Sequence, residues 1–157
     1  MPISSYLAEL RAIVGHRLLM MPSASAVIRD DAARILLAED ISTGFWALPG
    51  GAIEPHERPA EAVVRELHEE LNVAVKPTHL LGVFGGPEYV LEYHNGDRVA
   101  YVVTLFECEI VQGAPRADQK EVAQCRFVDL ADLDALPVAP WARHALRRIG
   151  VGLEMAD

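Results

Sequence analysis

Short apolar runs separated by turn residues extend along most of the chain and predict a β-sheet of several strands. The pair Asn95-Gly96 stands between two runs rich in β-branched and aromatic residues, which is the strongest short-range signal for a β-hairpin. A short apolar segment at 45–48 ends in the loop Pro49-Gly50-Gly51. The expected strands are 18–28, interrupted by Pro22, and 34–38, 80–84, 89–93, 98–111 and 121–128.

Apolar residues recur at helical spacing in three segments, 4–14, 59–71 and 139–149. In the first segment Ser4 or Ser5 can cap the helix, and Gly15 is a typical stop signal. Helices of this kind cover the faces of a sheet, so the pattern predicts the α/β (α+β) class with a mixed sheet. A chain of 157 residues has about the length of one domain, and we expect a single domain over residues 1–157.

Composition and charge narrow the range of functions. The chain is 51% hydrophobic and 24% charged, which is typical of a globular protein and excludes a disordered one. Its net charge of −9 disfavours nucleic acid polymers and anionic membranes as partners. The longest apolar run, 99–106, is shorter than the ~18 residues of a membrane-spanning helix, and two cysteines make no disulfide framework. We expect a cytoplasmic protein with a small ligand.

The helix expected at 59–71 carries an acidic stripe next to its apolar one. At about 100° per residue, four charged side chains fall within one arc of about 140°: Arg65, Glu66, Glu69 and Glu70. Apolar residues at i, i+4 and i+8 from Val63 form the neighbouring stripe that faces the core. We therefore expect the acidic stripe to face solvent beside the core.

Three carboxylates so close together repel one another and raise one another's pKa unless a cation lies among them. Hard divalent ions prefer oxygen ligands, and Mg²⁺ usually binds substrate phosphates as well. The glycines at 50 and 51 let the backbone approach a ligand closely, which makes Gly51 a candidate substrate contact. The alternative is a solvated surface helix in which Arg65 pairs with Glu69 four residues later.

The same residues resemble the sequence box of the Nudix hydrolase family. In that box a glycine is followed after five residues by Glu, and after seven more by Arg-Glu-aliphatic-any-Glu-Glu-any-Gly-aliphatic. The box spans residues 51–73, and the matching positions are Gly51, Glu57, Arg65, Glu66, Leu67, Glu69, Glu70 and Val73. Asn72 replaces the late glycine, with little expected effect because Asn best tolerates the left-handed conformation. The resemblance implies the Nudix fold, a mixed β-sheet sandwiched between α-helices.

The resemblance also implies a reaction and its residues. Nudix enzymes hydrolyse a diphosphate that links a nucleoside to another moiety, with Mg²⁺ or Mn²⁺ as cofactor. Carried over by position, the expected metal ligands are Glu66, Glu69, Glu70 and the carbonyl of Gly50, with Glu121 as a further candidate outside the box. Arg65 would orient a carboxylate through Glu57 or Glu69. The general base is Glu66 or Glu69, and Glu121 is the candidate outside the box.

The residues leave the substrate open. Nucleoside triphosphates and ADP-ribose-like or sugar nucleotides are the two groups to test first. Trp46 could stack on a base, although a Trp in the segment Phe45-Trp46-Ala47-Leu48 is more often a core residue. The alternative to an enzyme is a Nudix domain that binds a nucleotide or metabolite as a sensor without cleaving it. Homodimers are common in the family, so a homodimer is a candidate assembly.

Overall fold

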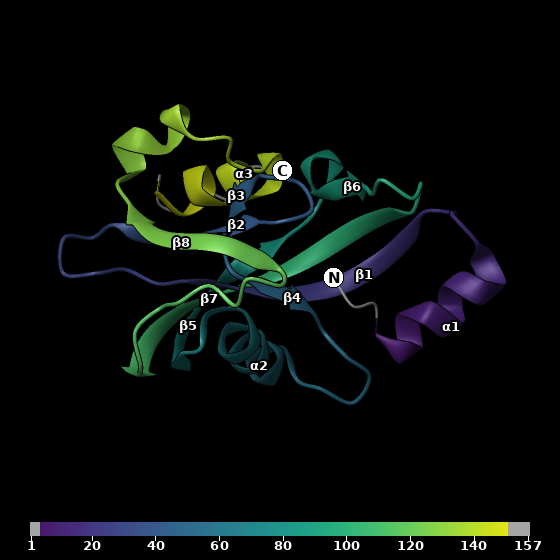
Figure 1. Ribbon diagram of the computed structural model, residues 1–157, viewed down its shortest axis with the longest axis horizontal. Coiled ribbons are helices and arrows are strands. Elements are labelled where there is room, and N and C mark those ends of the chain that lie inside the picture. The colour runs from purple at the N-terminus through teal and green to yellow at the C-terminus, as the bar shows by residue number, and fades with distance from the viewer. Residues whose placement is uncertain (1–3, 151–157) are drawn as a thin grey trace.

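The computed structural model describes residues 4–150, and two β-sheets form its centre (Figure 1). In the larger sheet β1 and β7 run parallel, and every other strand pair is antiparallel. Its order is β4 (Gly50–Ala52), β1 (Leu19–Val27), β7 (Arg98–Gln112) and β5 (Ala74–Phe84), with β6 (Val90–Glu92) also paired with β7. The smaller sheet has the order β3 (Trp46–Ala47), β2 (Ile35–Asp40) and β8 (Val122–Val128). The predicted mixed α+β class is confirmed, with the strands divided between two sheets.

Two helices cover opposite sides of the sheets, α2 (Pro59–Leu71) below and α3 (Pro140–Gly150) above in Figure 1. One apolar cluster includes Val63 and Leu67 of α2, and a second includes Ala142 and Leu146 of α3. The N-terminal helix α1 (Ser5–Val14) lies at the edge of the molecule and has no fully buried residue. Two short 3-10 helices, η1 (Pro87–Tyr89) and η2 (Leu130–Ala135), complete the described elements. Within residues 4–150 no helix is both long and apolar enough to cross a membrane.

The interruption predicted at Pro22 does not occur, because β1 is continuous from Leu19 to Val27. The carbonyl of Pro22 accepts a hydrogen bond from the N–H of Ile53, on the side of β4. Both backbone groups of a strand residue point to the same side, so the missing N–H of Pro22 faces away from β7. The parallel ladder to β7 therefore loses no hydrogen bond, and the proline is tolerated within the strand.

Strand β5 is longer than the sequence predicts, because it begins at Ala74 rather than Leu80. The missed half contains Pro77, which argues against a strand in a sequence pattern. In the structure β5 is an edge strand, and its register shifts between Pro77 and His79. An edge position and a bulge are where a sheet accepts proline, and only the tertiary arrangement reveals them.

The predicted hairpin and the predicted N-terminal cap are both confirmed. Asn95 and Gly96 lie in the turn between β6 and β7, where Gly96 adopts a positive φ of 86°. The hydroxyl of Ser4 accepts a hydrogen bond from the N–H of Leu7 at 3.2 Å, so Ser4 is the N-cap of α1. Both elements line the larger of two cavities, which is described below.

Candidate active site

Helix α2 has well-defined ends that fix the direction of its acidic side chains. At its start the N–H of Arg58 donates to the carboxylate of Glu61 at 2.9 Å, and Pro59 occupies the first turn. At its end Asn72 adopts the left-handed conformation (φ 55°, ψ 34°), and its N–H donates to the carbonyl of His68. Asn72 therefore ends α2 in the left-handed conformation that asparagine was expected to tolerate at this position.

The acidic residues of α2 do not share one solvent-facing stripe. Glu66 and Glu70 are only 7% and 8% exposed, whereas Glu69 is exposed. Strand β4 lies directly against them, since the N–H of Gly50 donates to Oε2 of Glu70 at 3.1 Å. A Cβ atom added to Gly51 would lie 2.5 Å from the Glu66 carboxyl carbon. The prediction of a solvated stripe is therefore wrong for Glu66 and Glu70, because the glycine strand covers both.

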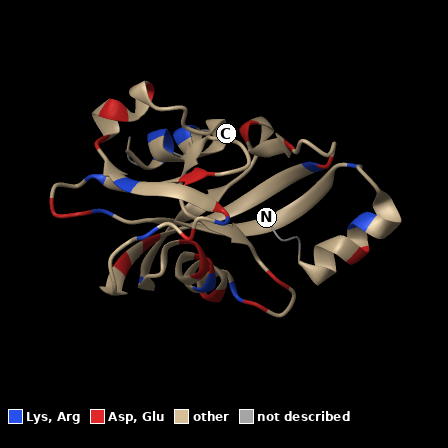
Figure 2. Cartoon of the chain, in the orientation of Figure 1, with Lys and Arg blue, Asp and Glu red and all other residues tan. Residues whose placement is uncertain are grey.

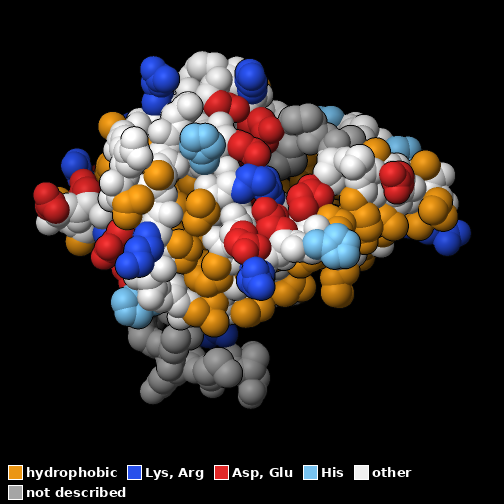
Figure 3. All heavy atoms as spheres, turned by 90° about the horizontal axis from the view of Figure 1, so that it is seen from below, with side chains coloured by type: hydrophobic (Ala, Val, Ile, Leu, Met, Phe, Trp, Pro, Cys, Tyr) orange, Lys and Arg blue, Asp and Glu red, His pale blue; other side chains and the backbone are white. Residues whose placement is uncertain are grey.

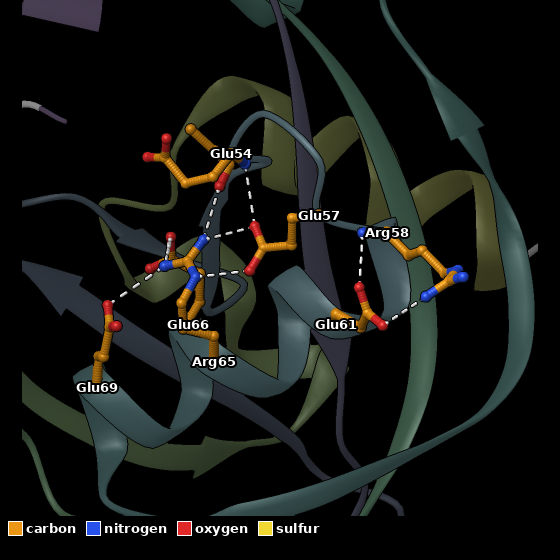
Figure 4. A network of polar contacts seen from close by, with 8 residues as sticks. Glu54, Glu57, Arg58, Glu61, Arg65, Glu66 and Glu69 are labelled. Atoms are coloured by element: carbon orange, nitrogen blue, oxygen red, sulfur yellow. Dashed lines mark hydrogen bonds and ion pairs between the residues drawn. The ribbon is translucent and has the colours of Figure 1, made fainter. Parts of the chain in front are cut away.

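Arg65 is the centre of the polar network drawn in Figure 4. Its guanidinium donates to Glu57 through Nε at 2.7 Å and Nη2 at 3.0 Å, a two-bond contact with one carboxylate. It also donates to Glu66 at 2.8 Å, to Glu69 at 3.3 Å and to the carbonyl of Ala52 at 3.0 Å. Arg65 therefore ties the loop before α2, the strand β4 and two carboxylates of α2 into one unit.

The charges of this network shift the pKa values in opposite directions. The hydrogen bond from Arg65 lowers the pKa of Glu57, and the same bond raises the pKa of Arg65 further above its usual range. Burial raises the pKa of Glu66, and it raises the pKa of Glu70 strongly, with the negative charge of Glu66 adding to the effect. Figure 2 shows acidic positions gathered on α2 and the loop before it. Burial and mutual repulsion thus disfavour the charged forms of Glu66 and Glu70, and of these two only Glu66 is bonded to Arg65.

Glu121 approaches this group from the loop that precedes β8. Its charge contributes to the raised pKa of both Glu66 and Glu70, and burial raises its own pKa. Asp118 holds the loop, because its Oδ1 accepts the N–H groups of Lys120, Glu121 and Val122 at 3.0, 3.1 and 2.9 Å. The N–H of Asp118 donates to the carbonyl of Glu70 at 2.9 Å. Sequence analysis missed Asp118, although an aspartate that caps following N–H groups is a known turn signal.

The donor set fits a hard divalent cation, although its carboxylates are engaged with protein groups. Among residues 4–150 no three acidic, histidine or cysteine side chains already converge on one point. Arg65 binds Glu66 and Glu69, and the N–H of Gly50 binds Glu70. The buried charge on Glu66 and Glu70 is nevertheless what a doubly charged ion with oxygen preference would relieve.

Two adjoining cavities open beside the carboxylates. The inner cavity, of about 340 Å³, is lined by Glu70, Gly50 and Gly51 and by Trp141 of α3. The outer cavity, of about 910 Å³, is lined by Arg65, Glu66 and Glu69 and by Leu7 and Arg11 of α1. Glu121 lines both. Seen from below in Figure 3, acidic side chains form a band in the middle of the face, with basic side chains beside it.

The structure does not bring Trp46 to the cavities. Trp46 is 5% exposed and belongs to the apolar cluster beneath α3, and the guanidinium carbon of Arg126 lies 4.8 Å from its ring centre. Trp46 has no free face for a base in this structure. Trp141 and Phe45 line the inner cavity instead, and no local sequence pattern singles out either residue.

The fold and the site together define a class, an α+β protein with a group of carboxylates beside two cavities. Comparison with known proteins identifies the family. The NUDIX domain model matches residues 19–149. The chain therefore belongs to the Nudix family.

Individual relatives resemble this chain at moderate sequence identity. The Nudix hydrolase YvcI of Bacillus subtilis is 27% identical over 115 residues, 72% of this chain and 69% of that protein. The ADP-ribose pyrophosphatase of Methanocaldococcus jannaschii is 29% identical over 137 residues, 85% of this chain and 77% of that protein. The crystal structure of a MutT Nudix hydrolase from Burkholderia pseudomallei has a TM-score of 0.68 at 28% identity, covering 82% of this chain and 97% of that one.

Proposed function

We propose that this protein hydrolyses the diphosphate linkage of a nucleoside diphosphate joined to another moiety, with Mg²⁺ or Mn²⁺ as cofactor. The observation that carries the proposal is the pair of buried carboxylates, Glu66 and Glu70, beside the glycine strand and two open cavities. Two neighbouring buried carboxylates, of which only Glu66 is paired with Arg65, suit a bound cation and an anionic ligand beside them. The named activity of the Methanocaldococcus relative, an ADP-ribose pyrophosphatase, agrees with this reaction.

The residues proposed to hold the ion are Glu66, Glu69 and Glu70, with the carbonyl of Gly50, and Glu121 is assigned to the general base below. When bound, such an ion neutralises phosphate oxygens and lowers the pKa of a water molecule that it holds. Arg65 keeps Glu57, Glu66 and the carbonyl of Ala52 in one place, so it positions the carboxylates. The backbone of Gly51 lines the inner cavity, where a substrate can approach it without a side chain in between.

A carboxylate that accepts a proton from water must be free to do so and must reach the reacting atoms. Glu66 and Glu69 meet the second condition, but both accept hydrogen bonds from Arg65. Glu121 forms no ion pair with Arg65, lines both cavities, and has a pKa raised by burial. We therefore favour Glu121 over Glu66 and Glu69 as the general base.

The proposal is tested with a panel of nucleoside triphosphates, ADP-ribose and sugar nucleotides in the presence of Mg²⁺. Release of nucleoside monophosphate is the expected result, and a chelator should abolish it. Glu70→Gln should remove turnover while retaining the fold, because glutamine has nearly the same volume and its oxygen can still accept from the N–H of Gly50. Without metal, the variant should be more stable than the parent, since it removes a buried charge.

Glu61→Gln is the matched control, because Glu61 lies on the exposed side of the same helix and glutamine keeps its acceptor oxygen. This control should retain parental turnover. Hydrolysis by Glu70→Gln at the parental rate would show that the site is wrongly assigned. Binding of a nucleotide without cleavage of any compound in the panel would identify the protein as a sensor.

A further inference from the structure

The inner and outer cavities adjoin one another beside the carboxylates and have several lining residues in common, Glu92 and Glu121 among them. Glu70 lines the inner cavity, Glu66 and Glu69 line the outer one, and Glu121 lines both. A diphosphate bound at these carboxylates would therefore extend one end into each cavity. The charge and polarity of the residues that line the two cavities then determine which groups can be attached to the diphosphate.

Neither cavity suits further phosphates. Apart from the carboxylates already assigned to the reaction, the inner cavity is lined by Asp40, Glu88 and Glu92, and among the described residues it contains no lysine, arginine or histidine. The outer cavity adds Glu54 and Asp97, and its described basic side chains are Arg11, Arg65 and His94. His94 is exposed, and its Nε2 lies 3.1 Å from the carbonyl oxygen of Ser42. A third phosphate would lie in one of these cavities, where the wall carries the same sign of charge. Such a contact is repulsive unless a further cation accompanies it.

Both arginines of the outer cavity are already engaged. Arg65 holds Glu57, Glu66 and Glu69, as described above. Arg11 donates to the carbonyl of Arg98 at 2.9 Å and to that of Arg17 at 2.7 Å, and it lies 3.6 Å from a carboxylate oxygen of Asp97. These bonds connect α1 to the start of β7. Arg11 thus holds the outer wall in place and is not free to bind phosphate.

The walls instead offer acceptors and flat apolar surfaces. Trp141, Pro140 and Leu91 line only the inner cavity, and they provide a surface against which a base can stack. In the outer cavity the exposed carboxylates of Glu69 and Glu92 can accept hydrogen bonds from hydroxyl groups. A neutral group rich in hydroxyls matches this wall better than an anion does.

We infer that the substrate is a nucleoside diphosphate joined to a neutral polyhydroxylated group, with its base in the inner cavity and that group in the outer cavity beneath α1. The inference rests on the proposed function and chooses between the two substrate groups that the proposal leaves open. Nucleoside triphosphates are the disfavoured group. Helix α1, which has no fully buried residue, has the role of a subsite wall in this arrangement.

The first experiment compares kcat/KM for ADP-ribose and UDP-glucose with kcat/KM for ATP and UTP at one Mg²⁺ concentration. The sugar-linked compounds should be favoured by at least about tenfold, because one repelled charge near 4 Å at intermediate dielectric corresponds to more than that factor. Titration calorimetry with the α,β-methylene analogues of ADP-ribose and ATP should give the same order of affinity without turnover.

Two variants test the outer wall. Arg11→Ala should release α1 and raise KM for ADP-ribose with little change in kcat for ATP. Arg17→Ala is its control, because Arg17 contributes only its backbone carbonyl to the contact with Arg11. Glu92→Lys places a cation at both cavities and should shift the ATP to ADP-ribose ratio of kcat/KM toward ATP by about threefold or more. Glu9→Lys, an equal charge change on the exposed side of α1, should leave the ratio unchanged.

The outcomes separate this inference from the proposed function. Hydrolysis of ATP or UTP with a higher kcat/KM than ADP-ribose and UDP-glucose would overturn the inference and leave the proposed function standing. An unchanged KM for ADP-ribose in Arg11→Ala would overturn the role of α1. Failure of the parent protein to hydrolyse any of the four compounds would overturn the proposed function as well.

Discussion

The close approach of Gly51 to Glu66 gives the sharpest single test of the site. Replacement of Gly51 by alanine places a Cβ 2.5 Å from both Cδ and Oε1 of Glu66 and 2.8 Å from Oε2. Carbon atoms in contact are separated by about 3.5 Å or more, so the carboxyl group must move by about 1 Å. That movement pulls Oε1 away from Arg65, which it meets at 2.8 Å.

The effect on the fold and the effect on activity should differ strongly. The displaced atoms are the end of a side chain, and Gly51 has no left-handed φ, so Gly51→Ala should lower the free energy of unfolding by only about 1 kcal/mol. A displacement of about 1 Å in a positioned group can lower the rate about 100-fold. We expect a loss of kcat of that order, measured as nucleoside monophosphate release, with a thermal unfolding temperature close to that of the parent.

Alanine substitutions at two further glycines provide comparisons for Gly51→Ala. Gly85→Ala is the neutral control, since its Cβ would meet the carbonyl oxygen of Tyr101 at an ordinary 3.7 Å. Gly50→Ala should fail by unfolding instead, because its Cβ would overlap the backbone carbonyl oxygen of Ala24 and its φ is +145°. Parental kcat in a folded Gly51→Ala protein would refute the reasoning, since it would show that the position of the Glu66 carboxyl does not matter.

Three other substitutions test features around the site. Asp118→Ala removes the acceptor of three N–H groups and should lower the free energy of unfolding by about 2 kcal/mol in denaturant titrations, with reduced kcat because the loop that carries Glu121 loosens; unchanged stability would contradict that role. Asn72→Ala should destabilise the protein by about 1 kcal/mol through its left-handed backbone and leave kcat/KM unchanged, and an equally stable variant would argue against strain at this position. Tyr89 is fully buried and bonded to His144, and burial raises its pKa to about 12 from about 10 in an unfolded chain. Ionisation therefore favours unfolding, so the parent should lose about 2 kcal/mol of stability as pH rises from about 10 to 12, and Tyr89→Phe should lack that part of the loss when the two denaturation curves are compared.

Local patterns determined the helices, the hairpin and the acidic stripe of this protein. The helix over Pro59–Leu71, the cap at Ser4 and the turn at Asn95-Gly96 follow from periodicity and from side chains that act on their own neighbours. A contact of Arg65 with Glu57 or Glu69 was also predicted, and the structure has both, since spacing along a helix and its preceding loop keeps these groups within reach. Such features depend on a few consecutive residues, so sequence suffices to find them.

Tertiary structure alone decided which carboxylates are buried and where a ligand has space. Glu66 and Glu70 are covered because β4, which pairs with the distant β1, lies across them without side chains at Gly50 and Gly51. The same packing places Trp46 in the core and Trp141 in the wall of the inner cavity. Each tryptophan is followed by an alanine, so their local sequences do not predict this difference. Burial, and with it the pKa and the charge balance of a site, depends on residues brought together from separate parts of the chain. No periodicity within one segment contains that information.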